Sequence, residues 1–307
     1  MSRKRMLVTG HRGQVVTSLI ERNAYAARFD IVTVGRPQFD LRVPESIGPA
    51  IERMAPDIIV SAAAFTAVDR AESEEELAMQ VNGLAPGEIG RTAARLSVPL
   101  IHLSTDYVFD GSSAAPYTED CPVAPLSVYG RSKLAGERGV AAAGADHVVL
   151  RTAWIYGPHG ENFAKTMLRL ARMKSEIPVV DDQIGNPTSS LDLADAIIAV
   201  AEHLLADRST DLRGIFHVAA SGEASWADFA SDVFSRAAAC GGPSTRVRAI
   251  PSADFPALAR RPANSRLNCE LIKRIHGVAL PDWRSSMARD VSRLVEQDRE
   301  VGRRREA

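Results

Sequence analysis

Short apolar runs rich in β-branched residues alternate with longer helical patterns through the first half of this 307-residue chain. Such runs carry few polar positions, as expected of strands that are buried on both faces of a sheet. The runs are Met6–Thr9, Ile31–Val34, Asp57–Ala64, Leu100–Ser104 and His147–Thr152. The stretches between them predict helices over Pro44–Met54, Ala71–Leu96 and Val128–Ala143. This order predicts an α/β fold built on a doubly wound parallel sheet of the Rossmann type.

The alternation loosens after Gly157, which predicts a second and smaller unit. Its expected elements are helices at Asn162–Met173, Leu193–Leu205 and Trp226–Ala239, an apolar run at Gly214–Ala220 and a proline-rich passage at Ile250–Pro262. We expect residues 1–157 to form a dinucleotide-binding domain, to which elements near 175–220 also contribute. Residues 158–300 are expected to form mainly a substrate domain, partly interleaved with the first.

Composition excludes several classes of partner. The net charge is −1 and the isoelectric point is near 6.7, so no excess of positive charge argues for nucleic acid or an anionic membrane. No apolar run approaches the roughly 20 residues that a membrane span needs. The three cysteines form no C-x-x-C pair, which predicts a reducing compartment and hence the cytoplasm. The seven histidines show no ligand spacing, so no metal site is expected.

The sequence VTGHRGQVV places Gly10 and Gly13 between the first strand and the first helix. Glycines in this context let backbone amides approach a pyrophosphate, and the helix N-terminus adds a partial positive charge. Val16 stands where a full dinucleotide fingerprint has its third glycine. The partial match leaves a plain strand-to-helix turn as the alternative, and its position at the first strand favours a cofactor site.

The end of the second strand predicts the form of the cofactor. An NAD site often has an acidic residue here for the ribose diol, whereas this chain has Gly35 and Arg36. A guanidinium suits a 2′-phosphate, because its planar donors bond two oxygens while its charge offsets theirs. NADPH is therefore the expected cofactor, with NADH also admitted, and Arg36 as a solvated surface residue is the alternative. Asp40 is a candidate acceptor for the adenine amino group.

Tyr129 and Lys133 lie four residues apart in a predicted helix, so both project from one face. We expect the ammonium to lower the pKa of the phenol and make it a better proton donor. Ser104 and Thr105 end the preceding strand and place a hydroxyl at the sheet edge where ligands bind. The three groups predict reduction of a ketone: Thr105 donates a hydrogen bond to the carbonyl oxygen, Tyr129 delivers the proton, and Lys133 holds the cofactor ribose.

Several motifs together carry a resemblance over nearly the whole chain. They are GxxGQ, VSAAAFTAVDRAES, STDYVFDG, YGRSKLAGE, RTAWIYG, NFAKTMLRLA and RPANSRLN. The chain resembles the extended short-chain dehydrogenase/reductase superfamily and, within it, the dTDP-4-dehydrorhamnose reductase family. The resemblance implies NADPH-dependent reduction of dTDP-4-dehydro-β-L-rhamnose to dTDP-β-L-rhamnose, the last step of dTDP-rhamnose synthesis for polysaccharide.

The resemblance also implies site residues by motif position. Thr105, Tyr129 and Lys133 match the catalytic hydroxyl, acid and lysine. The cofactor cradle corresponds to Gly13, Gln14, Val15, Asp40, Leu41, Ala64, Phe65 and Thr66. Asp106 and Trp154 match residues that meet the sugar, and Asn264 and Ser265 are candidates for the nucleotide pyrophosphate or sugar. The alternatives are a core role for Trp154, a loop cap for Asp106 and closure of a proline-rich turn for Asn264 and Ser265. Phe65 departs from the histidine frequent in relatives.

Two competing functions remain open. A 4,6-dehydratase or epimerase shares the fold and cofactor, but a dehydratase typically has an Asp-Glu pair after the threonine, and this chain has Asp106 and Tyr107. The other is a non-catalytic NADP-binding regulatory subunit, disfavoured by the intact catalytic trio. The expected partner is a small nucleotide sugar. The sequence leaves the oligomeric state open, with a homodimer as one option.

Overall fold

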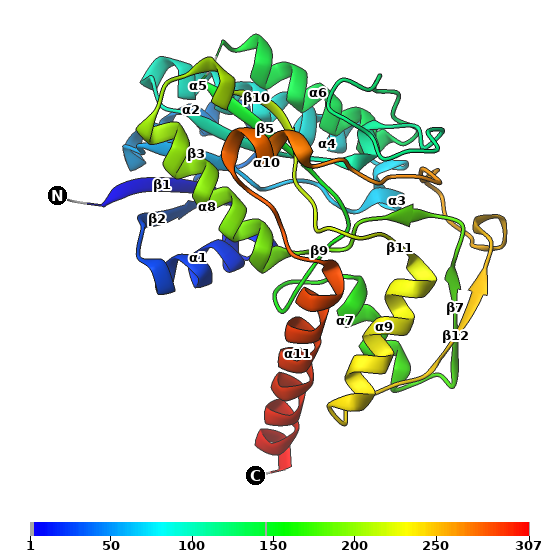
Figure 1. Cartoon of the computed structure of the whole chain (residues 1–307). Helices are drawn as coiled ribbons and strands as arrows, with labels where there is room; N and C mark the ends of the chain where they lie inside the picture. Colours follow the sequence, from blue (N-terminus) through cyan, green and yellow to red (C-terminus); the bar gives the residue numbers. More distant parts are fainter. Residues whose placement is uncertain (1–2, 145, 307) are drawn as a thin grey trace.

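A fully parallel sheet runs through the larger part of the molecule in a computed structural model that describes residues 3–144 and 146–306 (Figure 1). Its strands are β1 (Lys4–Thr9), β2 (Phe29–Val34), β3 (Ile58–Ser61), β4 (Leu100–Thr105), β5 (His147–Thr152) and β10 (Gly214–His217). Their order is β10-β5-β4-β3-β1-β2. Strand β1 has β2 on one side and β3 on the other, so the chain changes direction across the sheet at β1. The fold class predicted from the sequence is confirmed.

Helices cover both faces of this sheet. One face carries α1 (Gln14–Ala26), α8 (Ser190–Ala206) and α10 (Glu270–His276), and the other carries α2 (Pro44–Met54), α5 (Ala85–Leu96) and α6 (Val128–Ala142). Side chains of β1 alternate between them: Met6 and Val8 join the apolar cluster under α1 and α8, whereas Leu7 joins the cluster under α2 and α5. Both faces of the strand are therefore buried, which explains its continuous apolar run.

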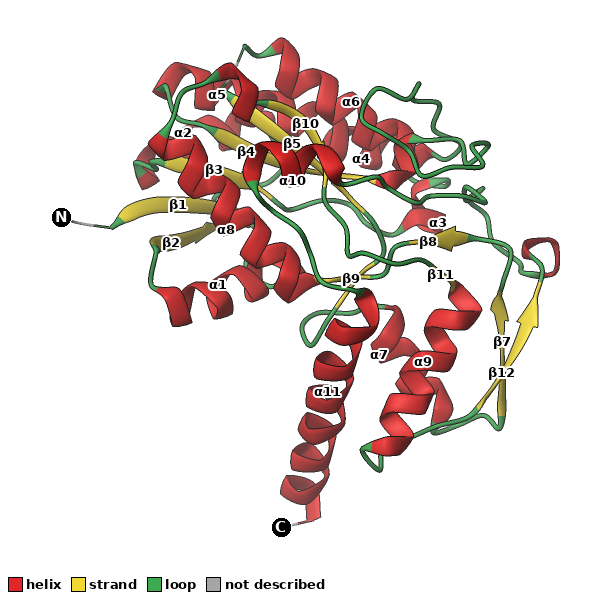
Figure 2. Ribbon diagram, in the orientation of Figure 1, coloured by secondary structure: helices red, strands yellow, loops and turns green. Residues whose placement is uncertain are grey.

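A second layer of elements lies beside the carboxyl edge of the sheet (Figure 2). It contains α7 (Phe163–Ala171), α9 (Trp226–Ala239), α11 (Trp283–Glu306) and the parallel pair β7 (Glu176–Val180) and β12 (Arg246–Ile250). Its apolar cluster centres on the buried Phe229 and Trp283. Four two-residue strands join this lobe to the first: β6 (Ile155–Tyr156) pairs with β9 (Thr188–Ser189), and β8 (Ile184–Gly185) pairs with β11 (Ala224–Ser225).

Between these second-lobe elements the chain returns to the sheet through α8 and β10, and α11 extends away from the sheet (Figure 1). Short 3₁₀ turns lie at Asp106–Val108, Thr210–Leu212 and Ser252–Asp254. No helix within the described ranges is both long and apolar enough to cross a membrane.

The long helix expected over Ala71–Leu96 is interrupted. It appears as α3 (Val68–Ala71), α4 (Glu75–Met79), a π-helical turn at Gln80–Leu84 and α5. The π-helical turn carries the buried Asn82, whose Oδ1 accepts from the amide of Phe65 at 2.8 Å and whose Nδ2 donates to the backbone oxygen of Phe65 at 3.0 Å. Such a turn commonly marks a functional region, and here it fixes the loop that follows β3.

Two other boundaries differ from expectation for local reasons. The run expected over Asp57–Ala64 stops pairing at Ser61, because the amides of Ala62 and Ala63 donate to Thr9 Oγ1 instead (both 3.0 Å). Helix α8 begins at Ser190 rather than Leu193, since the side chain of Ser189 caps it.

Close packing of α6 against the π-helical turn generates a stability prediction. A Cβ added at Gly136 would lie 2.2 Å from the carbonyl oxygen of Asn82, so a backbone segment would have to move. We expect Gly136→Ala to lower the free energy of unfolding by about 1–3 kcal/mol, although alanine is favoured in helices by about 1 kcal/mol. Urea denaturation measures it. Gly48→Ala in α2 is the matched control, because its nearest neighbours are side-chain atoms of Arg95 and Thr92. Equal losses in both variants would contradict the prediction.

Candidate active site

A cavity of about 440 Å³ opens at the carboxyl edge of the sheet, beside the point where the strand order reverses. In open α/β sheets ligands bind at this place. Its wall comes from the β1–α1 turn, the loop after β3, the end of β4, α6 and the segment after β5. The lining residues are Thr9, Gly10, Arg12, Gly13, Gln14, Val15, Val16, Ala62, Ala63, Ala64, Thr66, Leu103, Ser104, Tyr129, Lys133, Thr152, Ile155, Gly160 and Glu161.

The β1–α1 turn fits the phosphates of a dinucleotide. Gly10 has a φ of +98°, which side chains other than glycine rarely adopt. A Cβ at Gly13 would meet only Val16, at 4.0 Å, so this backbone faces open space. Gly13 is also the N-cap of α1 and brings no capping side chain, which leaves the first amides of α1 available to an anion. Thr152 adds a buried hydroxyl that has no hydrogen-bond partner among the described residues.

Helix α6 brings the expected acid and lysine to the cavity. Tyr129 and Lys133 both line the wall, as their four-residue spacing predicts. The Nζ of Lys133 donates to the backbone oxygen of Leu103 at 2.6 Å, so the amine sits against the end of β4. Tyr129 lies edge-on to the ring of Tyr107, with centroids 5.9 Å apart.

A buried ion pair lies one helical turn beyond Lys133. Glu137 receives two hydrogen bonds from Arg151 of β5, at 3.0 and 2.8 Å, and another from the hydroxyl of Ser104 in β4. Both side chains are only 3% exposed. Such a pair is costly to break, because either partner alone would be an uncompensated buried charge. It fixes the face of α6 that carries Tyr129 and Lys133 to two strands at once.

The hydroxyl of Thr105 is engaged within the protein. It donates to Oδ1 of Asp106 at 2.9 Å and accepts from the amide of Tyr107 at 3.2 Å. It also lies close enough to the phenol of Tyr129 to lower that group's pKa. The structure therefore brings Thr105, Asp106 and Tyr129 together. The proton expected to face a substrate carbonyl points instead to Asp106.

Burial dominates the proton affinities here. It raises the pKa of Tyr129 to about 12, partly offset by Thr105 and reinforced by Asp106. Burial also lowers the pKa of Lys133 to about 8. The expectation that Lys133 lowers the pKa of the phenol is not met in the chain alone, because the phenolate is desolvated and the amine bonds Leu103. Tyr129 is consequently a protonated donor at neutral pH.

Asp106 is also fully buried, and burial raises the pKa of its carboxyl to about 7, while Ser265 and Thr105 lower it. Its Oδ2 has no hydrogen bond of ordinary geometry within the described residues. Ser265 in turn accepts from the indole of Trp154 at 3.2 Å. Three of the four residues expected at the sugar thus lie together.

Trp154 has an unusual backbone and a specific partner. Its φ is +45°, which is rare for a bulky residue. Its ring stacks on Trp226 with centroids 3.5 Å apart and planes 4° apart. A Cβ at Gly185 would lie 2.5 Å from the Trp154 ring, so the strand beside it must carry glycine. Strain of this kind is typical of functional sites.

The side chain of Asn264 makes its hydrogen bonds within the protein. Its Nδ2 donates to the backbone oxygens of Ser113 and Ala115, and its Oδ1 accepts from the backbone and side chain of Arg266. Both amide donors are used by a loop far away in the sequence, so the side chain ties two loops together rather than only closing its own turn. Its role toward the nucleotide stays a prediction.

Four residues expected in the cofactor cradle are not part of the described cavity wall: Arg36, Asp40, Leu41 and Phe65. The carboxylate of Asp40 pairs with Arg42, which holds its pKa below the usual value. Phe65 packs beside Tyr129 under the guanidinium of Arg70. Their cofactor roles remain predictions.

Other residues of the wall escaped the sequence interpretation. They are Thr9, Arg12, Leu103, Thr152, Ile155, Gly160 and Glu161, together with the small side chains Ala62 and Ala63. Arg12 lies inside the quoted glycine turn and was open to recognition as a cation beside phosphates. Gly160 and Glu161 reach the wall only through folding. No group of three His, Cys, Asp or Glu in the described ranges has a metal-binding arrangement.

Comparison with known proteins gives a consistent result over the whole length. Residues 4–296 match the family model described as RmlD substrate binding domain. A dTDP-4-dehydrorhamnose reductase of Sinorhizobium fredii is 48% identical over 95% of this chain and 98% of its own. The Burkholderia thailandensis protein of that name is 38% identical over 95% of this chain and 100% of its own. The crystal structure of the Bacillus anthracis dTDP-4-dehydrorhamnose reductase in complex with NADP superposes with a TM-score of 0.86, at 32% identity, and covers 94% of this chain and 99% of its own.

The parallel sheet, its glycine turn and the Tyr129–Lys133 pair at one cavity define an oxidoreductase of the extended short-chain dehydrogenase/reductase class. Within that class, the chain belongs to the dTDP-4-dehydrorhamnose reductase family.

The raised pKa of Asp106 generates a pH prediction. The unfolded carboxyl titrates near 3.8 and the folded one near 7, so the folded state retains a proton that the unfolded chain has released, and stability falls as pH rises between these values. Asparagine is neutral throughout. We therefore expect the free energy of unfolding of Asp106→Asn, measured relative to wild type, to be about 3 kcal/mol higher at pH 8 than at pH 5. Each pH unit between the two pKa values contributes about 1.4 kcal/mol.

Urea denaturation of the ligand-free protein at both pH values tests this. Asp110→Asn is the control, because hydrogen bonds from Ser112 and Tyr117 lower the pKa of that carboxyl. The Asp110 carboxyl therefore does not titrate between pH 5 and pH 8, and the difference in unfolding free energy between this variant and wild type should be the same at both pH values. A constant offset for Asp106→Asn would contradict the prediction.

Proposed function

We propose that the chain catalyses NADPH-dependent reduction of dTDP-4-dehydro-β-L-rhamnose to dTDP-β-L-rhamnose, the last step of dTDP-rhamnose biosynthesis. The observation that carries this proposal is the meeting of Tyr129, Lys133 and the Thr105–Asp106 pair beside one cavity that also holds the glycine turn. Membership of the family and the similarity to a relative crystallised with NADP support it.

The residues that would hold the cofactor follow from the wall of the cavity. Gly10, Gly13 and the first amides of α1 suit the pyrophosphate. Arg12 lies in the turn itself, and Arg36 follows Gly35, whose backbone packs against His11 of the turn. Lys133 and Thr152 offer hydrogen-bond donors farther along the wall. When bound, the dihydronicotinamide supplies the hydride for C4 of the sugar.

The chain supplies the proton and stabilises the charge. As the ketone oxygen becomes an alkoxide, Tyr129 transfers its phenolic proton to it, which completes the alcohol. Thr105 lies beside this phenol, and in the protonated state Asp106 can donate to Thr105 and release the threonine hydroxyl toward the substrate. Lys133, charged below its pKa of about 8, lies one turn from Tyr129 on the same face of α6 and would hold the cofactor ribose. The buried surroundings strengthen each interaction.

The stack of Trp154 and Trp226, together with Ser265 and Asp106, is the proposed contact for the sugar. Aromatic faces suit the apolar face of a deoxysugar, and the carboxyl and hydroxyl groups suit its hydroxyls. Substrate roles of Asp106, Trp154 and Ser265 are part of the proposal, whereas both amide donors of Asn264 are already used within the protein.

A dehydratase needs a second acid or base at the position of Tyr107, which is instead a half-buried tyrosine hydrogen-bonded toward Arg261. The geometry thus favours simple reduction. The other alternative, a regulatory NADP-binding subunit without catalysis, gains no specific support, since the catalytic trio is in place.

The remaining proposals concern context. A cytoplasmic location is supported by the three unpaired cysteines and by the need for NADPH. A homodimer stays a prediction, to be measured by sedimentation.

Tyr129→Phe tests the assignment of the acid. The assay follows loss of the dihydronicotinamide absorbance when the protein is mixed with NADPH and enzymatically generated 4-keto sugar nucleotide. We expect kcat to fall by at least about 100-fold, because the variant has no proton to transfer. Tyr107→Phe removes the hydroxyl of the neighbouring ring and should keep kcat within about tenfold of wild type. No turnover by the wild-type protein would overturn the reductase proposal, and an active Tyr129→Phe would overturn the acid.

Arg36→Ala tests the phosphate role in the same assay run with NADPH and NADH. Loss of the guanidinium should raise the KM for NADPH about tenfold and leave the KM for NADH unchanged, because only NADPH carries the 2′-phosphate. Arg42→Ala, an exposed arginine paired with Asp40, is the control. If Arg36→Ala has the same ratio of KM for NADPH to KM for NADH as wild type, Arg36 does not bind the 2′-phosphate.

A further inference from the structure

The loop between β6 and α7, residues 157–162, links the second lobe to the proposed cofactor cavity. Gly160 and Glu161 form part of the cavity wall. Gly160 has a φ of +61°, and a Cβ there would lie 2.8 Å from Gln14 Cγ, so the loop rests directly on the first turn of α1. A small displacement of this loop therefore changes the wall of the cavity beside the glycine turn.

Asn162 and Lys165 hold one end of the loop, both to itself and to the first residue of α1. Asn162 caps α7 and donates to Gln14 Oε1 at 3.0 Å and to the backbone oxygen of Gly157 at 2.9 Å. Lys165 donates to the backbone oxygen of Gly160 at 2.7 Å. The tip of the loop, His159, is held by a second residue of α1, Glu21.

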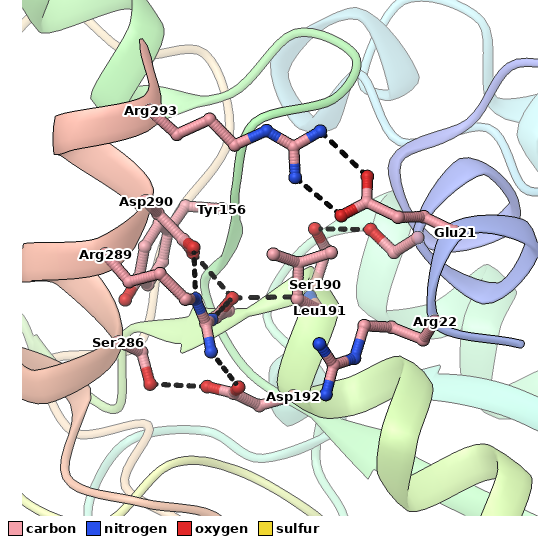
Figure 3. Close-up of polar contacts among 12 residues, drawn as sticks. Glu21, Arg22, Tyr156, Ser190, Leu191, Asp192, Ser286, Arg289, Asp290 and Arg293 are labelled. Carbon is pink, nitrogen blue, oxygen red and sulfur yellow. Dashed lines mark hydrogen bonds and ion pairs between the residues drawn. The ribbon is translucent and has the colours of Figure 1, made fainter. Parts of the chain in front are cut away.

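Glu21 of α1 binds His159 and the C-terminal helix at the same time. Its Oε2 lies 2.7 Å from His159 Nε2. Arg293 of α11 donates to both of its oxygens, at 2.6 and 2.8 Å (Figure 3). The Arg293 guanidinium is the largest influence that lowers the pKa of Glu21, to about 2, so the carboxylate is charged throughout the physiological range. We name Glu21, His159 and Arg293 the Glu21 clamp.

Apolar packing does not make this connection. Helix α1 contributes to the cluster under α8, and α11 contributes to the cluster of the second lobe; among the described residues no member of α1 belongs to the latter cluster. In Figure 3 the Arg293–Glu21 pair joins α11 to α1, whereas the other polar contacts of α11 bind Ser189 and Asp192 at the start of α8. Bidentate geometry and a third partner make the clamp more effective than an isolated surface ion pair.

We propose that the Glu21 clamp positions the 157–162 loop against the bound dinucleotide, so that Glu21, His159 and Arg293 are positioning residues for NADPH. The inference rests on the proposed function, since NADPH is the ligand. It makes the placement of the C-terminal helix a determinant of cofactor affinity, through residues that do not themselves line the cavity.

The neighbouring residue provides a matched control. Arg22 follows Glu21 in α1 and forms an equally close bidentate pair with Asp195 of α8, at 2.7 and 2.7 Å. Helix α8 already packs on α1 through the apolar cluster, and neither Arg22 nor Asp195 contacts the loop in the described contacts. Breaking this pair removes an ion pair of α1 but leaves the loop held.

The test compares Glu21→Gln, His159→Ala and Arg293→Met with Asp195→Asn. Isothermal titration calorimetry gives the Kd for NADPH, and hydrogen exchange of residues 157–162 is measured in the ligand-free protein. We expect each clamp variant to raise the Kd by about three- to tenfold and to accelerate exchange in the loop, with kcat at saturating NADPH within about twofold of wild type. Arg293→Lys should restore part of the affinity.

Asp195→Asn should leave both the Kd and the exchange of the loop at wild-type values. The proposal is overturned if the clamp variants bind NADPH as wild type does, or if Asp195→Asn weakens binding equally. Wild-type protein that fails to bind NADPH would instead refute the proposed cofactor. In that case the exchange measurement still decides whether the clamp holds the loop, since it needs no ligand.

Discussion

The ion pair between Glu137 and Arg151 fixes the geometry on which the candidate site depends. Tyr129, Lys133 and Glu137 occupy successive turns on one face of α6, and the carboxylate is bonded to both β4 and β5. A rotation of the helix that misplaced the phenol would also expose or unpair a charge that is almost completely buried. The helix therefore has one favourable orientation on the sheet. Packing of Gly136 against the backbone of Asn82 also fixes the distance between α6 and the π-helical turn.

The same burial decides the chemistry of the groups that α6 presents. Desolvation keeps the phenol of Tyr129 protonated and raises the pKa of the Asp106 carboxyl to about 7. These groups are therefore proton donors rather than bases, which suits a reaction in which negative charge develops on a ketone oxygen. Lys133 provides the nearby positive charge. The absence of a carboxylate at Tyr107 removes the group that elimination would require.

The two lobes share this site through polar connections. Ser265 joins Trp154 to the neighbourhood of Asp106, and the 157–162 loop joins α7 and α11 to the glycine turn. The two largest apolar clusters lie one in each lobe, with Leu280 packed against both. Polar connections of this kind have defined geometry but can be adjusted by small movements, which suits a cleft that must admit both a dinucleotide and a sugar nucleotide.

Period and spacing within the sequence determined the α/β class, the sheet with its glycine turn, and the Tyr129–Lys133 pair, because each depends on residues close together in the chain. Motifs such as STDYVF and RPANSRLN determined the family, now confirmed by whole-length similarity. Only the tertiary structure showed that Asn82 anchors the loop of Phe65 and that the amide of Asn264 binds the backbone at Ser113. It likewise showed that Glu21 bonds both His159 and Arg293. These contacts join residues far apart in sequence. The pKa values of Tyr129 and Asp106 likewise depend on how completely the folded chain excludes water, which no local pattern encodes.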